Sequence, residues 1–274
     1  MTRSILITGC SSGIGLDAAG AMKARGWRVI ATARREQDLE ILRREVGVDA
    51  LYLELADPKS IAACAEAALE MTGGKLDALF SNAAFGQPGA VEDIRPELLR
   101  EQLEVNVVGT HDLTRRFIPS MRRNGAGRIV QCSSILGFVA VAYRGPYCAS
   151  KHALEALTNA MRLELAGTGI HVSLIEPGPI RSRFVESAMQ RFQANIDIEG
   201  SAHRESYLAR LEAMKAGGQS VFKLEPAAVT KRLIHAVESS RPQRRYYVTI
   251  PTYLAAGFQR LLPAFATEYF ARKF

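Results

Sequence analysis

The sequence predicts an α/β protein with a doubly wound, mostly parallel sheet of seven strands and helices on both faces. Short apolar runs alternate with longer helical patterns along most of the chain, which is typical of right-handed β-α-β crossovers. A glycine-rich stretch separates the first run from the first helix. The chain has 274 residues, 47% of them hydrophobic, which is enough for the core of one large domain. We therefore expect a single domain over residues 1–274.

Seven apolar runs are expected to form the strands, because each is short and ends at turn-forming residues. These runs are residues 3–8, 27–33, 49–55, 76–80, 128–132, 171–175 and 246–250. Helices are predicted at residues 15–25, 58–71, 96–124 and 226–238, with another helix around residue 147. Parallel sheets of this kind bind ligands at the carboxyl ends of their strands, so residues that follow the runs are candidates for a site.

The first run leads into Thr8-Gly9-Cys10-Ser11-Ser12-Gly13-Ile14-Gly15. Glycines in such a loop permit a tight turn and a close approach of the backbone to a pyrophosphate, whose charge is held by the N-terminus of the next helix. The stretch also matches Gly-x-Ser-x-Gly, the nucleophile elbow of α/β hydrolases. A hydrolase needs strands and an oxyanion loop before the elbow, whereas Ser11 lies near the start of the chain. The position therefore favours a dinucleotide loop.

The second run is followed by Arg34 and Arg35. NAD-binding folds usually offer an acidic residue here to the ribose 2′-hydroxyl, whereas cations suit the 2′-phosphate of NADP. The alternative is a pair of solvated arginines that open the next helix. Since the missing acid disfavours NAD independently, we predict NADP (NADPH) as the cofactor.

Polar residues after later runs have both structural and functional interpretations. Asp57 precedes Pro58 and is expected to cap the next helix. Residues 81–86, which include Asn82, form a small-residue turn that lets a flat ligand approach. Asn106 lies inside a helical pattern, where asparagine is weakly unfavourable, so it is either exposed or held there for its hydrogen bonds.

Tyr147 and Lys151 lie four residues apart in Tyr-Cys-Ala-Ser-Lys and share one helix face. A nearby ammonium favours the phenolate, so we expect Lys151 to lower the pKa of Tyr147 and make it a general acid or base. An ordinary pair on a solvated helix face is the alternative. Ser134 follows the fifth run, and its hydroxyl can stabilise developing oxyanion charge.

Two segments near the C-terminus are set apart. Residues 183–224 have helical patterns with scattered large apolar side chains, and they form either a lid beside the ligand edge or a plain pair of helices that closes the core. Residues 253–274 are an apolar, basic C-terminal extension. Arg260 and Pro263 interrupt it, so it cannot span a bilayer but could lie on one.

The net charge of +7 is concentrated at the end of the chain, where residues 226–274 carry eight basic and two acidic residues. An anionic partner, such as a membrane surface or an acidic carrier protein, suits this bias, although a solvated basic surface is the simpler interpretation. No motif indicates nucleic-acid binding. The four cysteines lack metal-ligand spacing and the first residues lack a signal-peptide pattern, so we expect no metal and a cytoplasmic location.

Together these motifs make the chain resemble the short-chain dehydrogenase/reductase family over nearly its whole length, nearest the branch with 17β-hydroxysteroid and retinol dehydrogenases. The matching features are the Thr8–Gly15 loop, the Asn82-Ala83 turn, Asn106, Ser134, the Tyr147/Lys151 pair and Pro177-Gly178. Several ordered motifs are more specific than any one of them. The resemblance implies a Rossmann fold, an oxidoreductase, and a homodimer or homotetramer.

The resemblance also implies roles for individual residues. Tyr147 would exchange the proton with the substrate oxygen, Lys151 would hold the nicotinamide ribose, and Ser134 would bind the carbonyl oxygen. Asn106 would place a water in a proton relay, and Arg34, with Arg35 beside it, would meet the 2′-phosphate. The other implied cofactor contacts are Gly9, Ser11, Ser12, Gly13, Ile14 and Gly15 at the pyrophosphate and adenosine ribose, Asp57 at the adenine, Asn82 near the ribose, and Pro177, Gly178, Ile180 and Ser182 towards the carboxamide.

Two positions depart from the family pattern: Ala84 replaces the glycine of Asn-Ala-Gly, and Ser182 replaces a threonine but keeps the hydroxyl. The expected reaction interconverts an alcohol and a carbonyl on a lipophilic small molecule with a steroid-, retinoid- or acyl-like skeleton. Candidates for its pocket, each of which could equally be core, are Phe85, Leu136, Phe138, Tyr143, Phe184, Met189 and Phe192. The alternative is a dinucleotide-sensing or scaffold protein on the same fold. Intact Ser134, Tyr147 and Lys151 argue against it.

Overall fold

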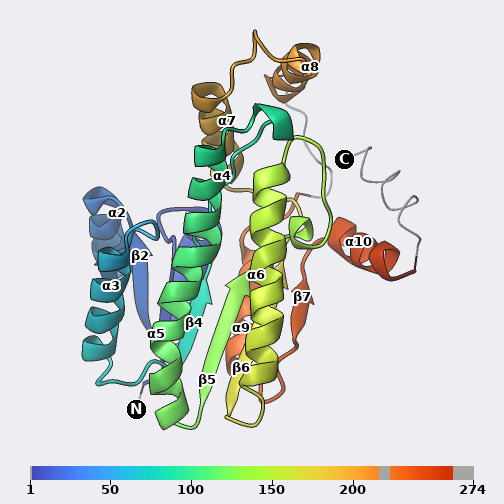
Figure 1. Cartoon of the computed structure of the whole chain (residues 1–274). Coiled ribbons are helices and arrows are strands. Elements are labelled where there is room, and N and C mark those ends of the chain that lie inside the picture. Colours follow the sequence, from blue (N-terminus) through green and yellow to red (C-terminus); the bar gives the residue numbers. More distant parts are fainter. Residues whose placement is uncertain (1, 216–222, 262–274) are drawn as a thin grey trace.

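The computed structural model describes residues 2–215 and 223–261. Its centre is a sheet of seven parallel strands in the order β3-β2-β1-β4-β5-β6-β7 (Figure 1). The strands are β1 (Ser4–Ile7), β2 (Arg28–Ala33), β3 (Asp49–Tyr52), β4 (Ala78–Ser81), β5 (Gly127–Cys132), β6 (Ile170–Glu176) and β7 (Arg245–Tyr247). The predicted doubly wound fold is confirmed, and the strand order reverses direction at β1, which is the point where such sheets bind ligands.

Helices connect the strands and cover the sheet. They are α1 (Gly13–Ala24), α2 (Glu36–Ile41), α3 (Pro58–Met71), α4 (Pro96–Leu103), α5 (Thr110–Arg123), α6 (Gly145–Glu164), α7 (Phe184–Asn195), α8 (Arg204–Lys215), α9 (Ala227–Glu238) and α10 (Ile250–Leu261). Short 3-10 turns lie at Val91–Asp93 and Ile135–Gly137, and π-helical turns lie at Leu42–Val46 and Glu104–Gly109.

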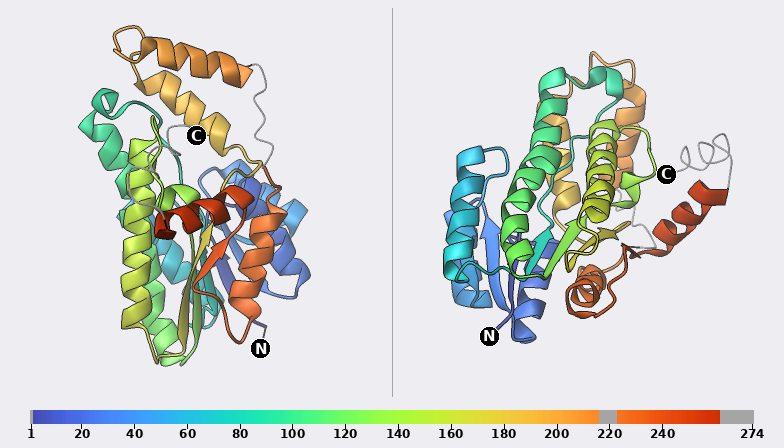
Figure 2. Two further views of the ribbon diagram at one scale, coloured as in Figure 1. Left: turned by 90° about the vertical axis from the view of Figure 1, so that its right-hand side faces the viewer. Right: turned by 60° about the horizontal axis from the view of Figure 1, so that its bottom comes forward.

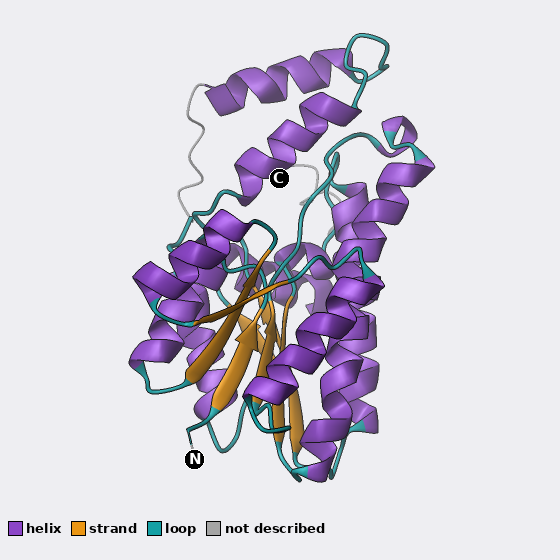
Figure 3. Ribbon diagram, turned by 90° about the vertical axis from the view of Figure 1, so that its left-hand side faces the viewer, coloured by secondary structure: helices purple, strands orange, loops and turns teal. Residues whose placement is uncertain are grey.

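Both faces of the sheet are covered (Figures 2 and 3). Side chains alternate along a strand. Ile7 of β1 therefore belongs to the core under α1, α2 and α9, whereas Leu6 belongs to the core under α3, α5 and α6. Because a parallel strand is buried on both sides, it needs apolar residues in succession, and this explains the continuous apolar runs of the sequence.

Three predicted elements need correction. The strand expected over residues 49–55 covers only Asp49–Tyr52. The helix expected over residues 96–124 is divided into α4 and α5 by the π-helical turn Glu104–Gly109. The strand expected over residues 246–250 covers only Arg245–Tyr247. The carbonyl of Thr249 accepts hydrogen bonds from the N–H groups of Thr252 and Tyr253, and the chain turns into α10, with Pro251 in the first turn, where proline is tolerated.

Helices α7 and α8 lie beyond the carboxyl edge of the sheet, at the top of Figures 1 and 3. They share a small apolar core with Ala90, formed by Phe192, Ile196 and Tyr207. Residues 216–222 of the predicted lid segment lie outside the described residues. So do residues 262–274 of the predicted extension, whose described part belongs to α10, a helix that points away from the sheet (Figure 1). None of the described helices combines the length and the apolarity that a bilayer crossing requires.

Candidate active site

The glycine loop after β1 has no room for side chains at two of its glycines. A Cβ on Gly9, whose φ is +72°, would lie 2.9 Å from the Cα of Ala83, and one on Gly15 would lie 2.2 Å from the carbonyl oxygen of Gly9. Ser12 precedes α1 without a side-chain cap, and the first turn of α1 carries no acidic residue. The positive end of the helix dipole therefore remains available to an anion.

A groove of about 490 Å³ adjoins this loop. Its lining residues are Ser12, Gly13, Leu16, Arg181, Ser182, Arg183, Glu186, Lys223, Glu225 and Pro226. A Cβ on Gly13 would lie 2.9 Å from the Cβ of Ser182, so the glycine lets the two loops approach. Arg181 is paired with Glu225 at 2.7 Å, so the groove itself is of mixed charge. The bare helix end beside it fits the pyrophosphate of a dinucleotide.

Asn82 and Thr8 brace the loop against β4. The hydroxyl oxygen of Thr8 accepts hydrogen bonds of 2.9 Å from the N–H groups of both Asn82 and Ala83. The side-chain amide of Asn82 donates to the carbonyl oxygen of Thr8 at 3.0 Å. Thr8 was not predicted as a site residue, although its place at the end of the first apolar run could have indicated it.

The predicted contacts of the adenosine end lie at the ends of β2 and β3. The side chain of Arg34 is 67% exposed, and its Nη1 lies 3.4 Å from Glu54, at the limit of a hydrogen bond. Arg35 instead forms a forked ion pair with Asp38, with N···O distances of 2.7 and 2.9 Å. Asp57 accepts a hydrogen bond from the N–H of Lys59 at 2.9 Å, which confirms it as a helix cap. Of the two arginines, Arg34 is therefore the one held more weakly by a protein carboxylate, so its guanidinium is more available to a ligand.

Ser134, Tyr147 and Lys151 gather at the carboxyl end of β5. Tyr147 is half-buried in the first turn of α6. Lys151 is buried, its Nζ lies 5.7 Å from the ring centroid of Tyr147, and it donates a 2.7 Å hydrogen bond to the carbonyl oxygen of Cys132. Ser134 begins the 3-10 turn after β5 and accepts a hydrogen bond from the N–H of Leu136 at 3.1 Å. The three residues come from one strand end and one helix face, as their spacing predicted.

The pKa of Tyr147 is opposite to the prediction. Burial raises the pKa of this phenol above its ordinary value, while hydrogen bonding with Ser134 and the charge of Arg144 act in the lowering direction. Burial also lowers the pKa of Lys151, and its ammonium is directed at the Cys132 carbonyl. Tyr147 is therefore a protonated phenol at neutral pH in this structure, ready to donate a proton.

Asn106 lies in the π-helical turn and is 1% exposed. Its Oδ1 accepts from the N–H of Phe85 at 3.1 Å, and its Nδ2 donates to the Phe85 carbonyl at 2.9 Å and to the Ser150 hydroxyl at 3.1 Å. Of the two predicted alternatives, the second is therefore correct: Asn106 is held for its hydrogen bonds. It joins the turn after β4 to α6 beside Tyr147.

The predicted pocket residues divide between the surroundings of Tyr147 and helices α7 and α8. The ring of Phe184 lies 5.2 Å from that of Tyr147, and Phe85 lies under Arg191 at 4.0 Å. Phe192 of α7 is buried with its ring 4.9 Å from that of Tyr207 of α8, so it is a core residue between these two helices. The remaining four are half-buried: Leu136, Met189, Phe138 with its ring 6.0 Å from that of Tyr247, and Tyr143 with its ring 5.5 Å from that of Tyr207.

Sequence reasoning missed a group of buried acidic residues near Lys151. Arg245 of β7 bridges Glu155 of α6, at 2.7 Å, and Glu176 of β6, which are 5% and 0% exposed. The Ser133 hydroxyl donates to Glu155 at 2.8 Å. Burial raises the pKa of Glu176 to about 8. These residues meet only in the folded chain, although the position of Glu155 one turn after Lys151 was a usable signal.

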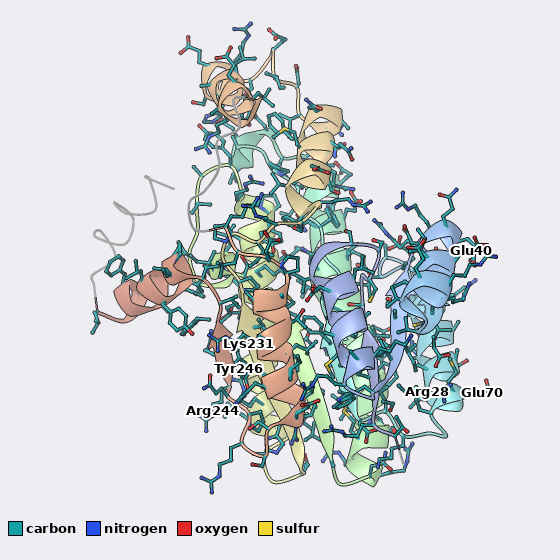
Figure 4. The ribbon with its side chains drawn as sticks, turned by 180° about the vertical axis from the view of Figure 1, so that it is seen from behind. Arg28, Glu40, Glu70, Lys231, Arg244 and Tyr246 are labelled. Atoms are coloured by element: carbon teal, nitrogen blue, oxygen red, sulfur yellow. The ribbon has the colours of Figure 1, made fainter. Side chains whose placement is uncertain are left out.

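A second hollow, of about 610 Å³, lies at the opposite edge of the sheet beside Lys23, Arg28 and Arg43. Arg28 is far from the lid (Figure 4). The basic groups there are already occupied: Lys23 donates to the Val46 carbonyl at 2.7 Å, Arg28 pairs with Asp49 at 2.8 Å, and Arg43 donates to the Ala50 carbonyl at 3.0 Å. We therefore place the site at the carboxyl edge. Among the described residues, no three His, Cys, Asp or Glu side chains gather as metal ligands would.

A family model described as short chain dehydrogenase matches residues 3–192, which include the glycine loop and the Tyr147/Lys151 pair. The chain belongs to the short-chain dehydrogenase family. Its members of known sequence include "Uncharacterized oxidoreductase YbbO" of Escherichia coli (strain K12), which is 39% identical over 263 residues, covering 96% of this chain and 91% of the relative. Human "17-beta-hydroxysteroid dehydrogenase type 1" is 32% identical, covering 89% and 77%.

Solved structures of short-chain dehydrogenases agree with this assignment. One from Streptomyces avermitilis has a TM-score of 0.81 and 28% identity, covering 98% of this chain and 96% of the other. A single-residue variant of the actinorhodin polyketide ketoreductase, solved with NADPH, has a TM-score of 0.75 and 30% identity, covering 90% and 95%. A short-chain dehydrogenase/reductase from Burkholderia phymatum in complex with NAD has a TM-score of 0.79 and 26% identity, covering 99% and 95%. The chain is thus an oxidoreductase of a family that binds nicotinamide dinucleotides.

Proposed function

We propose that this short-chain dehydrogenase is an NADP(H)-dependent oxidoreductase that interconverts an alcohol and a carbonyl on a lipophilic small molecule. The observation that carries the proposal is the convergence of Tyr147, Ser134 and Lys151 at the strand edge that also holds the glycine loop. A protonated phenol beside a serine hydroxyl is suited to polarise a carbonyl and to protonate the resulting alkoxide.

Four residues at the site have distinct parts in the proposed reaction. Ser134 donates a hydrogen bond to the substrate oxygen, and Tyr147 transfers its proton to that oxygen as negative charge develops. Lys151 lies one turn behind Tyr147, where its ammonium can favour the phenolate left by proton transfer. Asn106 bonds to the N–H and the carbonyl oxygen of Phe85, which fixes the turn after β4 beside the site.

The cofactor assignment rests on the glycine loop and on Arg34. The helix end after Ser12 and the neighbouring groove suit the pyrophosphate, and the exposed guanidinium of Arg34 suits a 2′-phosphate, for which Arg35 is less available because Asp38 holds it. When bound, the nicotinamide supplies or accepts the hydride. One structural neighbour was solved with NADPH and another with NAD, so the arginines of this chain are the basis for preferring NADP.

The lipophilic substrate is inferred from the apolar residues around Tyr147 and from the relatives. Phe184 and Phe85 are aromatic residues beside the catalytic group. The printed names of relatives include a 17-beta-hydroxysteroid dehydrogenase, a retinol dehydrogenase and a polyketide ketoreductase. These names favour steroid-, retinoid- or acyl-like skeletons over sugars. Helices α7 and α8 would act as the lid over such a substrate.

We also propose contacts with macromolecules. Exposed apolar residues on α6 and on the π-helical turn before α5, namely Val108 (50%), Leu157 (40%) and Leu163 (79%), suit a homodimer or homotetramer. Helix α10 exposes Ile250 (62%) and Leu254 (54%), and the basic residues Lys231 and Arg244 lie on the same side of the molecule (Figure 4), which suits peripheral contact with an anionic membrane or carrier. Deletion of residues 253–274 should then weaken liposome or carrier binding in a protein that remains folded.

The test of the enzymatic proposal is a fluorescence titration with NADPH and NADH, followed by a screen of ketones and aldehydes for oxidation of the reduced cofactor. We expect tighter binding of NADPH and turnover of bulky apolar carbonyls. Binding of both cofactors without turnover of any carbonyl would instead support a dinucleotide sensor, and failure to bind either would contradict the assignment of the glycine loop.

A further inference from the structure

Arg144 immediately precedes α6 and lies three residues before Tyr147. Its side chain is half-buried, yet within residues 2–215 and 223–261 its guanidinium has neither a hydrogen-bond acceptor nor an acidic partner. Two other half-buried arginines do have such partners: Arg116 pairs with Asp112 at 3.1 Å, and Arg162 donates to the Val172 carbonyl at 2.9 Å. None of the Arg144 nitrogens is among the buried polar atoms without a partner, so water reaches the guanidinium, and an anion bound there would replace water and give the charge a partner.

A second arginine adds positive charge at the same place. The guanidinium of Arg210, on α8, lies 4.5 Å from the ring centroid of Tyr143, the residue next to Arg144. Arg210 is exposed and has no acidic partner among the described residues. Burial, and then the charge of Arg210, lower the pKa of Arg144. The first turn of α6 has no acidic residue and no side-chain cap, so the helix dipole adds positive potential beside the two arginines.

The location ties this charge to the reaction. Tyr143 packs against His203 and Tyr207 of the lid, with ring centroids 5.4 and 5.5 Å apart, so the two arginines lie where the lid meets the start of α6. Burial raises the pKa of Tyr147, and the charge of Arg144, three residues earlier, acts against this rise. A molecule whose carbonyl reaches Tyr147 therefore lies within the electrostatic reach of Arg144.

We propose that Arg144, assisted by Arg210, binds a carboxylate or phosphate group carried by the substrate itself. A guanidinium forms paired hydrogen bonds with either group. The substrate class is then an amphipathic oxo compound, with an anionic group and an apolar chain or ring that meets Phe184. This inference rests on the proposed oxidoreductase function and narrows it.

The test compares a homologous series of ω-oxo fatty acids, from hexanoate to dodecanoate, with their methyl esters as substrates for the protein and NADPH. We expect kcat/KM for the best acid to exceed that of its ester by about 10-fold or more, as for a hydrogen-bonded charged group. Arg144→Gln should abolish this acid-to-ester ratio, and Arg144→Lys should restore part of it. The ratio is informative because any effect of Arg144 on Tyr147 changes both substrates equally. Arg241→Gln, at an exposed arginine of the α9–β7 connection, should leave the ratio unchanged.

Inhibition by decanoate and by decyl phosphate distinguishes a substrate carboxylate from a substrate phosphate. The inhibitor whose inhibition constant rises more in Arg144→Gln carries the group that Arg144 binds better. An equal acid-to-ester ratio in wild type and Arg144→Gln would overturn the inference while leaving the oxidoreductase intact. If no carbonyl is turned over, calorimetric titration with decanoate still decides. Loss of binding in Arg144→Gln supports an anion site, and unchanged binding refutes it.

Discussion

At the scale of single residues, the environment of Tyr147 determines how activity depends on pH. Its phenol remains protonated well above neutral pH because burial opposes the phenolate. Reduction uses the protonated form, so kcat/KM for a carbonyl should be flat through neutral pH and fall only at alkaline pH. Oxidation uses the phenolate and should rise with pH over the same alkaline range. Stopped-flow rates in both directions check this, and a fall in reduction below neutral pH would contradict it.

Arg34 and Arg35 form a matched pair for testing cofactor choice. Arg34→Ser should weaken NADPH binding by about 10-fold or more, because a charge-assisted bond to the 2′-phosphate is lost, while NADH binding changes little. Arg35→Ser should have a smaller effect, because Asp38 already holds that guanidinium. Fluorescence titration of both variants with both cofactors measures this. Equal losses for NADPH and NADH in Arg34→Ser would show that the arginine does not recognise the phosphate.

At the scale of elements, the buried charges of Glu155, Glu176 and Arg245 join α6, β6 and β7. The pKa of Glu176 lies above its ordinary value of 4.5, at about 8, so the folded protein binds an extra proton between these values. Stability is therefore lost as the pH rises through this window. Around Glu176 lie Glu155, Arg162 and Arg245, whose positive and negative charges partly cancel.

Glu176→Gln removes this titration while keeping a polar side chain. The melting temperature of the wild type should fall from about pH 6 to about pH 8, and that of the variant should fall less. Each kcal/mol corresponds to about 2–4 °C in a chain of this size class, so the difference is measurable by calorimetry. Glu164→Gln, at an exposed glutamate of α6, is the control and should behave like the wild type. Parallel curves for all three proteins would contradict the assigned pKa.

Tyr207 joins α8 to the 3-10 turn Val91–Asp93. Its buried hydroxyl donates to Asp93 at 2.5 Å and accepts from the N–H of Ala90 at 2.7 Å. Tyr207→Phe leaves the Ala90 N–H without its acceptor, while Asp93 keeps the hydrogen bond from the Ser201 hydroxyl at 2.6 Å. The change should cost about 1–3 kcal/mol, with a raised KM for bulky carbonyls. Tyr52→Phe, at a half-exposed tyrosine of β3, is the control. Thermal denaturation and KM values check the prediction. If the variant loses the predicted stability but its KM is unchanged, α8 does not cover the substrate.

The sequence could predict the elements because local patterns determine them. Continuous apolar runs indicated the strands, and Asp57-Pro58 marked the start of α3. The break at Glu104–Gly109 was not predictable from periodicity, because Asn106 is stabilised there by partners at Phe85 and Ser150, which are distant in sequence. β7 ends early because the chain turns into α10 at Thr249, with Pro251 in the first turn of that helix. The apolar pattern of residues 246–250 gives no sign of this turn.

At the scale of the whole molecule, the order of motifs predicted both the fold and the place of the site. A parallel sheet brings the residues after β1, β4, β5 and β6 to one edge, whichever side chains these residues carry. Electrostatics could not be predicted in this way. The raised pKa of Tyr147, the buried group around Arg245 and the unpaired Arg144 depend on burial and on contacts between distant segments.

The most direct test of the central claim is turnover by Tyr147→Phe, measured beside NADPH binding in the same preparation. The account predicts a loss of about 10²–10⁴-fold in kcat, the usual contribution of a general acid, with the dissociation constant of NADPH nearly unchanged. Retention of most of the wild-type kcat would contradict it, because another group would then have to move the proton.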